Sequence, residues 1–174
     1  LGVRKEDLPW RNGGGCTETM IHGRSNVGSL DAGVNLLRVL DRSLKRLLPA
    51  ARTFDELFEG FRRDLARAVR KTVEIVNANQ ETKARWAPQP MRSLLIDDCL
   101  ERGIGFNSGG ARYNWSVVNL GGLANVFDSL AALREVVYEK EEVSGQELAE
   151  VLATNFEGRE ELRRRLERSP RFGN

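Results

Sequence analysis

A single cysteine with a glutamate two residues later is the most chemically suggestive feature of this sequence. Cys16 follows the run Gly13–Gly15 and precedes Glu18. Glycines permit tight turns and close backbone approach, so a loop of this kind can present a sulfur at an accessible position. Thiol chemistry requires such a sulfur, and a neighbouring carboxyl can act beside it as general acid or base. Cys16 and Glu18 are therefore the catalytic candidates, although a lone cysteine in a loop is more often incidental.

A histidine offers this cysteine a second possible partner. His22, the one histidine of the sequence, lies six residues after Cys16 and could activate it as in a thiol hydrolase. Enzymes of that class usually draw the histidine from a distant part of the chain, so a hydrogen-bonding or structural role is favoured. We name His22 and Asp31 as the candidates for contacts with a small-molecule substrate.

Two further glycine-rich segments, residues 109–114 and 119–122, could in principle cradle a phosphate. Neither contains the P-loop sequence or the complete dinucleotide-binding pattern, so close backbone packing is the favoured interpretation. Cys99 follows two aspartates on a helical stretch and is expected to be a small buried side chain. The sequence has no CxxC pair, and one histidine cannot form a zinc site alone, so we predict no metal site and no bound cofactor.

Composition excludes several classes of protein. The 174 residues are 40% hydrophobic and 30% charged, which is ordinary for a folded domain. Basic and acidic residues nearly cancel to a net charge of +2, so nucleic acid is not an expected partner. No apolar run approaches the ~20 residues needed to cross a bilayer. Two cysteines do not make a disulfide scaffold, so a cytoplasmic location is expected.

Apolar periodicity and capping signals predict a mostly helical chain with one or two strands. The first 28 residues are rich in glycine and are predicted to be irregular. A first helix is expected to begin at Ser29 or Asp31 and to end near Leu48. The patterns Thr53–Glu56 and Ser144–Glu147 are capping boxes that should begin helices reaching at least Asn77 and about Asn155. The remaining expected elements are helices over residues 93–101, 123–139 and 157–168 and a strand over 113–120.

Several segments, in order along the chain, resemble the glycyl radical enzymes of the pyruvate formate-lyase superfamily. The family has a G-C-x-E loop, matched by Gly15–Glu18, and an Asp-Ala…Asn-Leu segment, matched by Asp31–Leu36. Further matches follow downstream, and together they span nearly the whole chain: Phe54–Leu57, Ser93–Cys99, Gly109–Asn114, Asp128–Ala132, Asn155–Gly158 and Pro170–Asn174.

The resemblance implies radical chemistry and an α/β barrel fold. It implies that Cys16 carries a thiyl radical, which abstracts hydrogen from a small organic substrate, and that Glu18 is the acid/base of the dehydratase and eliminase branch. Thr17 stands where pyruvate formate-lyase has a second cysteine, so a formate acetyltransferase-type C–C lyase is the less favoured alternative. A non-catalytic helical interaction domain is a further alternative. The implied partners are a radical activating enzyme that uses S-adenosylmethionine and an iron–sulfur cluster, and a second copy of the full enzyme in a homodimer.

One departure from the family pattern concerns the radical itself. The Arg-Val-x-Gly-aromatic motif that would store the glycyl radical does not occur in this sequence. We therefore expect residues 1–174 to be the helix-rich second half of the family's barrel domain, with the cysteine loop at residues 12–28. The glycyl radical domain and the first half of the barrel are expected in missing parts of a parent chain, and this polypeptide is expected to be inactive alone.

Overall fold

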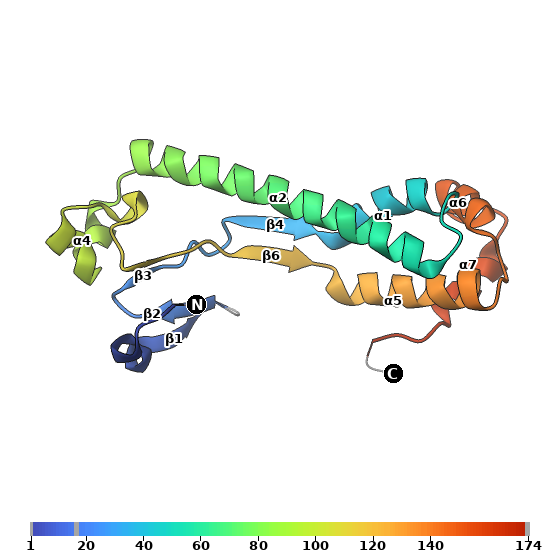
Figure 1. Ribbon diagram of the computed structural model, residues 1–174, viewed down its shortest axis with the longest axis horizontal. Coiled ribbons are helices and arrows are strands. Elements are labelled where there is room, and N and C mark those ends of the chain that lie inside the picture. Colours follow the sequence, from blue (N-terminus) through green and yellow to red (C-terminus); the bar gives the residue numbers. More distant parts are fainter. Residues whose placement is uncertain (1, 16–17, 173–174) are drawn as a thin grey trace. The chain divides into compact units, whose positions relative to one another are not determined.

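A computed structural model describes residues 2–15 and 18–172, and these residues form two compact units. Unit 1 comprises Leu1–Gly33 and Lys71–Asn119, and unit 2 comprises Val34–Arg70 and Leu120–Asn174. The long helix α2 (Phe54–Trp86) and the strands β4 (Ala32–Asn35) and β6 (Val118–Gly121) each have residues in both units (Figure 1). Each unit is described separately below.

Unit 1 contains short strands, 3₁₀ turns and short helices. Its first part, blue in Figure 1, is the 3₁₀ helix η1 (Lys5–Trp10) followed by β1 (Arg11–Gly14), β2 (Glu18–Ile21) and β3 (Ser25–Asn26). Its second part holds the end of α2 and then α3 (Pro90–Leu94), α4 (Asp97–Arg102), η2 (Phe106–Ser108) and β5 (Tyr113–Asn114). Strands β1 and β2 pair antiparallel, β3 pairs with β5 in parallel, and β4 pairs with β6.

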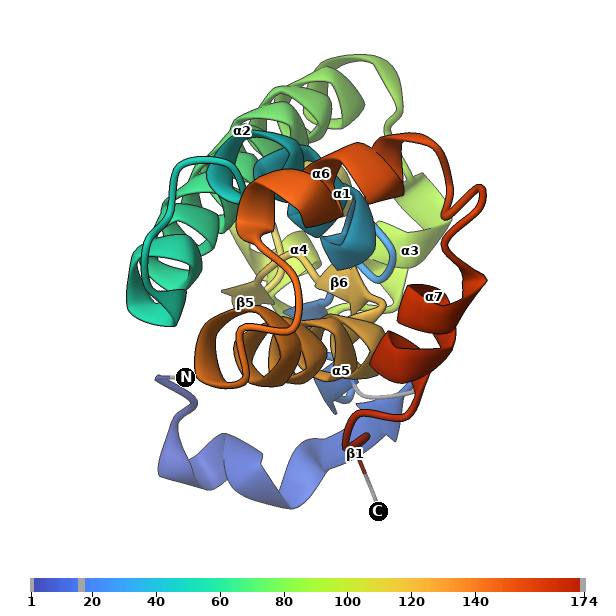
Figure 2. The ribbon, with the colours of Figure 1, turned by 90° about the vertical axis from the view of Figure 1, so that its right-hand side faces the viewer.

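Unit 2 is a helical assembly around an apolar core. Its helices are α1 (Leu36–Leu47), the first part of α2, α5 (Leu123–Leu133), α6 (Gly145–Ala153) and α7 (Glu160–Glu167), with a π-helical turn η3 (Arg134–Glu139) after α5. Helix α5 packs against α1 and α7, as the end view shows (Figure 2). Gly145 lets α6 begin against the first helix, because a side chain there would clash with the carbonyl oxygen of Leu48. The core side chains of this unit include Leu36, Leu40, Leu57, Leu130, Val136 and Leu148.

The hydroxyl cap of both predicted capping boxes is confirmed at the helix starts, and the reciprocal carboxylate bond does not form at Thr53. The Thr53 hydroxyl accepts a hydrogen bond from the Glu56 N–H at 3.2 Å, and the Ser144 hydroxyl accepts one from the Glu147 N–H at 3.1 Å. The carboxylate of Glu56 accepts the Arg52 N–H rather than the cap residue's own. Helix α2 then continues to Trp86, beyond Asn77, the residue that it was predicted to reach at least.

Three predicted boundaries are wrong. The first helix begins at Leu36, because residues 32–35 pair as a strand and the Asn35 side chain caps the helix by accepting the Arg38 N–H at 3.0 Å. The helix predicted over residues 93–101 is two helices, separated at Ile96, which has an extended backbone. The strand predicted over 113–120 is also two elements, because its first part pairs with β3 and its second part with β4.

The first 28 residues are more ordered than their composition predicts. They contain one 3₁₀ helix and three strands, and six short strands occur in all in residues 2–15 and 18–172. The expectation of one or two strands is therefore too low. The mostly helical character is confirmed, and all six strands are four residues or shorter.

Candidate active site

The strands on either side of the predicted catalytic cysteine form an antiparallel hairpin. Arg11 pairs with Ile21 at its base, and Gly14 pairs with Glu18 at its innermost described position. Cys16 and Thr17 lie outside the described residues. The predicted loop at residues 12–28 is thus mainly a hairpin followed by a turn, so strand pairing, rather than glycine content alone, fixes its flanks.

Two glycines allow side chains of the second strand to lie over the first. A side chain at Gly14 would clash with the Met20 thioether, and one at Gly15 would clash with the Glu18 carboxylate. Gly15 also has a φ of 59°, which favours glycine. The Glu18 carboxylate therefore lies close to the backbone immediately before Cys16 in the chain.

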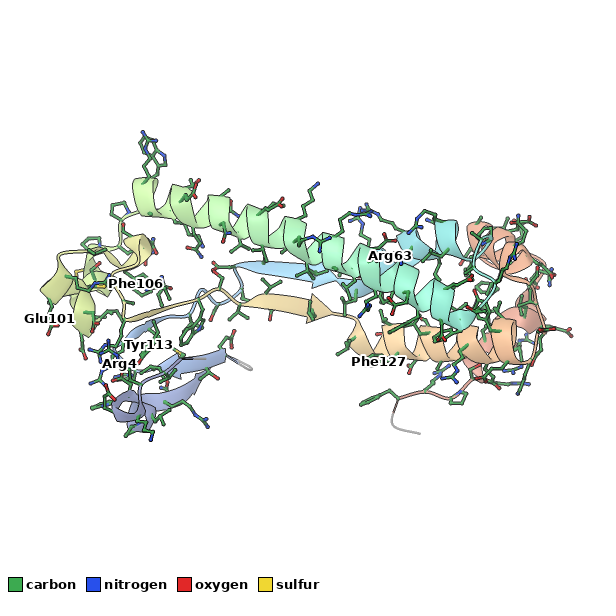
Figure 3. The ribbon with its side chains drawn as sticks, in the orientation of Figure 1. Arg4, Arg63, Glu101, Phe106, Tyr113 and Phe127 are labelled. Carbon is green, nitrogen blue, oxygen red and sulfur yellow. The ribbon has the colours of Figure 1, made fainter. Side chains whose placement is uncertain are left out.

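Glu18 and Met20 lie on the same face of β2, since alternate residues of a strand share a face. Met20 lines a cavity of about 500 Å³ within unit 1. Phe106, labelled in Figure 3, contributes an aromatic wall, and the Arg92 guanidinium lies 5.5 Å from the centre of its ring. The rest of the lining is rich in hydroxyl, amide and charged groups: Ser25, Asn26, Ser29, Asp31, Gln80, Lys83, Gln89 and Asn107.

Asp31 is the charged residue most firmly held in this cavity. Its side chain is 6% exposed and forms an ion pair with Lys83 at 2.7 Å. The Gln80 amide donates to its other oxygen at 2.5 Å. A side chain at Gly28 would clash with the Asp31 carboxylate and with the carbonyl of Trp115, so glycine at position 28 leaves room for it. The substrate-binding role of Asp31 stays a prediction, and this cavity is where Asp31 would contact the substrate.

His22 is exposed and is the first residue of the turn that follows β2. Its backbone N–H donates to the Trp10 carbonyl at 2.9 Å and so extends the hairpin pairing by one position. It is not among the residues that line the cavity. Its substrate contact stays a prediction, and the geometry favours the hydrogen-bonding interpretation.

A buried charge cluster at the base of the hairpin was not predicted from the sequence. Asp7 is fully buried and forms ion pairs with Arg24 and Arg112. The Tyr113 hydroxyl donates to it at 2.5 Å and accepts the backbone N–H of Arg4 at 3.0 Å, and Figure 3 labels these last two residues side by side. We call Asp7, Arg24, Arg112 and Tyr113 the Asp7 cluster.

The cluster favours the charged form of the Asp7 carboxylate. Hydrogen bonds from Tyr113 and Arg112 hold the pKa of Asp7 below its ordinary value, although burial opposes this. Burial, together with the Asp7 carboxylate, raises the pKa of the Tyr113 hydroxyl. No local sequence signal could have revealed the cluster, because Asp7 and Arg112 lie 105 residues apart.

The second cysteine, Cys99, lies in a packed part of unit 1. Cys99 is buried, as predicted, and burial raises the pKa of its thiol, which keeps it protonated. A side chain at Gly110 would clash with the Ile104 carbonyl and the Cys99 sulfur, which supports the packing interpretation of that glycine-rich segment. No group of metal-ligating side chains occurs in residues 2–15 and 18–172, and no helix within those ranges is long and apolar enough to cross a membrane.

Comparisons with known proteins address the resemblance directly. The family model for pyruvate formate lyase-like proteins matches residues 1–174. The chain is 30% identical to a probable dehydratase of Escherichia coli (strain K12), over 100% of this chain and 24% of that protein. It matches the glycerol-bound form of the B12-independent glycerol dehydratase from Clostridium butyricum with a TM-score of 0.93 and 26% identity, over 99% of this chain and 24% of that one. A glycyl radical enzyme from Archaeoglobus fulgidus matches with a TM-score of 0.86 and 26% identity, again over 99% of this chain.

The chain thus spans about a quarter of the length of these relatives. Their barrels contain the arrangement of helices and short strands described here, so the expected fold, a helix-rich part of an α/β barrel, is confirmed. The resemblance inferred from the ordered motifs is also confirmed. This chain belongs to the pyruvate formate lyase-like family of glycyl radical enzymes.

Proposed function

We propose that this chain is the part of a glycyl radical lyase that carries the thiyl cysteine, and that the enzyme belongs to the dehydratase or eliminase branch. Cys16 is the proposed thiyl residue and Glu18 the proposed acid/base. The observation that carries this proposal is the position of the Glu18 carboxylate, which lies against the Gly15 backbone next to Cys16 in the chain. It also shares a strand face with Met20, which lines the polar cavity.

The proposed chemistry divides into a hydrogen transfer and a proton transfer. A glycyl radical outside these residues, installed by an S-adenosylmethionine iron–sulfur activase, would supply the unpaired electron that Cys16 uses. The Cys16 sulfur then takes a hydrogen atom from a substrate carbon. Glu18 gives a proton to the hydroxyl or amine on the neighbouring carbon, which leaves as water or ammonia, a contribution of about 10²–10⁴-fold. The substrate radical gives up the proton of the hydroxyl on its radical carbon in return and becomes a neutral carbonyl radical. The hydrogen atom returns from Cys16 to the product carbon.

Cavity chemistry favours a compact polar substrate. Asp31, held by Lys83 and Gln80, offers carboxylate oxygens, and the surrounding amides and hydroxyls can bond several hydroxyl groups of one molecule. Thr17 stands where pyruvate formate-lyase has a second cysteine, so the formate acetyltransferase-type reaction is less favoured. The thiol hydrolase alternative gains no support from His22, which lies exposed in its turn.

We also propose partners and a location for the full-length protein. The activating enzyme must reach the full-length protein, and we propose that this protein is a cytoplasmic homodimer that includes the parts of the barrel missing here. Residues 1–174 alone would lack the radical-storing motif and would be inactive.

Activation of the full-length protein tests the proposed role of Cys16. After anaerobic activation the protein should show a glycyl EPR signal, and Cys16→Ala should keep that signal while abolishing turnover of a diol or hydroxy-acid panel. Cys99→Ala is the matched control, because Cys99 packs against Gly110 and should not affect turnover per radical. Normal turnover by the Cys16→Ala protein would show that the thiyl assignment is wrong.

A further inference from the structure

Both ends of the β1–β2 hairpin are fastened to the same buried cluster. Asp7 lies on η1, four residues before β1 begins at Arg11. Arg24 lies three residues after β2 ends at Ile21. These two residues form an ion pair with each other, so the Asp7 cluster joins the two strands where they enter and leave the hairpin.

The second strand has additional attachments near its end. The Arg24 guanidinium lies 5.0 Å from the centre of the Trp10 ring and donates to Asp97 at 3.2 Å. The Tyr113 N–H donates to the Arg24 carbonyl at 3.0 Å, where β3 and β5 begin to pair. The Asp97 N–H donates to the carbonyl of Gly23 at 2.9 Å. The turn after β2 is therefore held against α4 and β5.

Arg112 connects the cluster to helix α4. Its guanidinium donates to both Asp98 oxygens, at 2.8 and 3.0 Å, and also to both Asp7 oxygens, at 3.0 and 3.1 Å. A guanidinium is planar and its donors have fixed directions, so this double bridge fixes orientation as well as distance. Lysine could supply the charge at this position but could not form both bridges.

Burial makes the geometry of the cluster demanding. Asp7 is fully buried, and a buried carboxylate is costly unless charged and hydrogen-bonding partners surround it. Here Arg24, Arg112 and Tyr113 supply those partners. A shift of the hairpin base would break several of these bonds together, so the cluster permits one position of the hairpin relative to α4 and β5.

We propose that Asp7 and Arg112 are positioning residues for catalysis, which set the place of the hairpin and thereby the place at which the Cys16 sulfur meets the substrate carbon. This inference rests on the proposed function of Cys16. Hydrogen transfer requires reacting atoms in near contact, and a displacement of about 1 Å can cost about 10²-fold in rate. The cluster touches neither substrate nor sulfur in this proposal and acts through the hairpin alone.

Asp7→Asn in the full-length, activated enzyme is the principal test. The substitution keeps the shape of the side chain and removes the charge that Arg24 and Arg112 surround. We expect a glycyl radical yield equal to that of the parent enzyme and a kcat per radical that falls about 10²-fold. KM should change by less than about threefold, because an interaction that is needed only in the transition state affects kcat rather than substrate binding.

A half-buried carboxylate in unit 2 supplies the control. Glu135 pairs with Arg165 at 3.0 Å and Lys140 at 2.6 Å, and it is far from the hairpin in the sequence. Glu135→Gln should lower the melting temperature and leave kcat per radical unchanged. Two milder substitutions grade the effect: Arg112→Lys should reduce kcat per radical about tenfold and Tyr113→Phe about threefold, since each removes only part of the cluster.

The outcomes separate this inference from the proposed function. If the parent enzyme is active and Cys16→Ala is not, but Asp7→Asn, Arg112→Lys and Tyr113→Phe all keep the parent kcat per radical, the cluster is structural only and the inference is wrong. If the Asp7→Asn protein does not fold, the kcat per radical of Arg112→Lys and of Tyr113→Phe decides the question. An active Cys16→Ala protein would overturn the proposed function itself.

Discussion

The two units use opposite means to fix their elements. In unit 1, strands of two to four residues are held by a fully buried carboxylate with two arginines and a tyrosine. Helices of eight or more residues make up most of unit 2, and apolar side chains such as Leu57, Val136 and Leu148, all 0% exposed, hold them together.

Apolar packing and buried charge differ in how strictly they define a position. Apolar contacts are numerous and non-directional, so they stabilise a helical assembly that tolerates small shifts. A two-residue strand such as β3 has too few ladder hydrogen bonds to define its own place. Directional bonds from Arg112 and Tyr113 supply that definition in unit 1. Ion pairs of unit 2 such as Arg159–Glu147 lie at the surface, where they contribute little.

Glu18→Gln is expected to produce the largest effect that separates the units. The amide cannot exchange a proton as the carboxyl does, so kcat for dehydration should fall by about 10²–10⁴-fold with the glycyl EPR signal intact. Glu147→Gln in unit 2 is the control, since its carboxylate only pairs with Arg159 at the surface, and it should leave kcat unchanged. Equal losses in both variants would contradict the assignment of the chemistry to unit 1.

The same contrast explains what the sequence could predict. In unit 2 the information is local: apolar residues recur at helical spacing, and Thr53 and Ser144 cap their helices as expected. In unit 1 the information is distant, because β3 is defined by pairing with a strand almost ninety positions later in the chain, Ser25 opposite Tyr113. Periodicity cannot reveal such a partner. Asp31, for example, was predicted as a possible start of the first helix, but its carboxylate instead binds Gln80 and Lys83.

The residues of the candidate site also differ in whether the sequence alone could predict them. Cys16 and Glu18 were identified from adjacent residue types and from ordered motifs, both of which are visible in the sequence. The Asp7 cluster was not, because a lone aspartate near the start of the chain resembles any solvated charge until Arg112 is brought to it. Resemblance therefore identified the family and predicted a reactive pair, whereas only the fold reveals the cluster that joins β1 and β2 at the base of the hairpin.

Leu148→Ala tests the apolar half of the comparison and should give the second largest effect. Leu148 is 0% exposed on α6, so truncation leaves a cavity and should cost about 2–5 kcal/mol. Hydrogen exchange should report this loss as reduced amide protection in α6 and its neighbours in unit 2, with amides of unit 1 unchanged.

Leu152→Ala on the same helix is the control for that measurement. Leu152 is 39% exposed and its truncation should cost less than about 1 kcal/mol. An equal loss of protection in the two variants, or a loss that spreads evenly into unit 1, would show that the units do not differ in the way described.

Acid titration of Glu135→Gln should give the smallest effect and tests whether unit 2 also depends on a charge. Hydrogen bonds from Lys140, Ser169 and Arg165, in that order of effect, lower the pKa of Glu135 from 4.5 to about 2. Because the folded-state pKa lies below the ordinary one, its contribution to stability is fully present above about pH 4.5 and is lost as the pH falls towards 2. The melting temperature of the parent enzyme should therefore exceed that of Glu135→Gln by a constant amount between pH 5 and 8 (roughly the range of maximal stability). Below pH 4.5 the two should converge, and a difference that widened on acidification would mean that the carboxylate is stabilising when protonated.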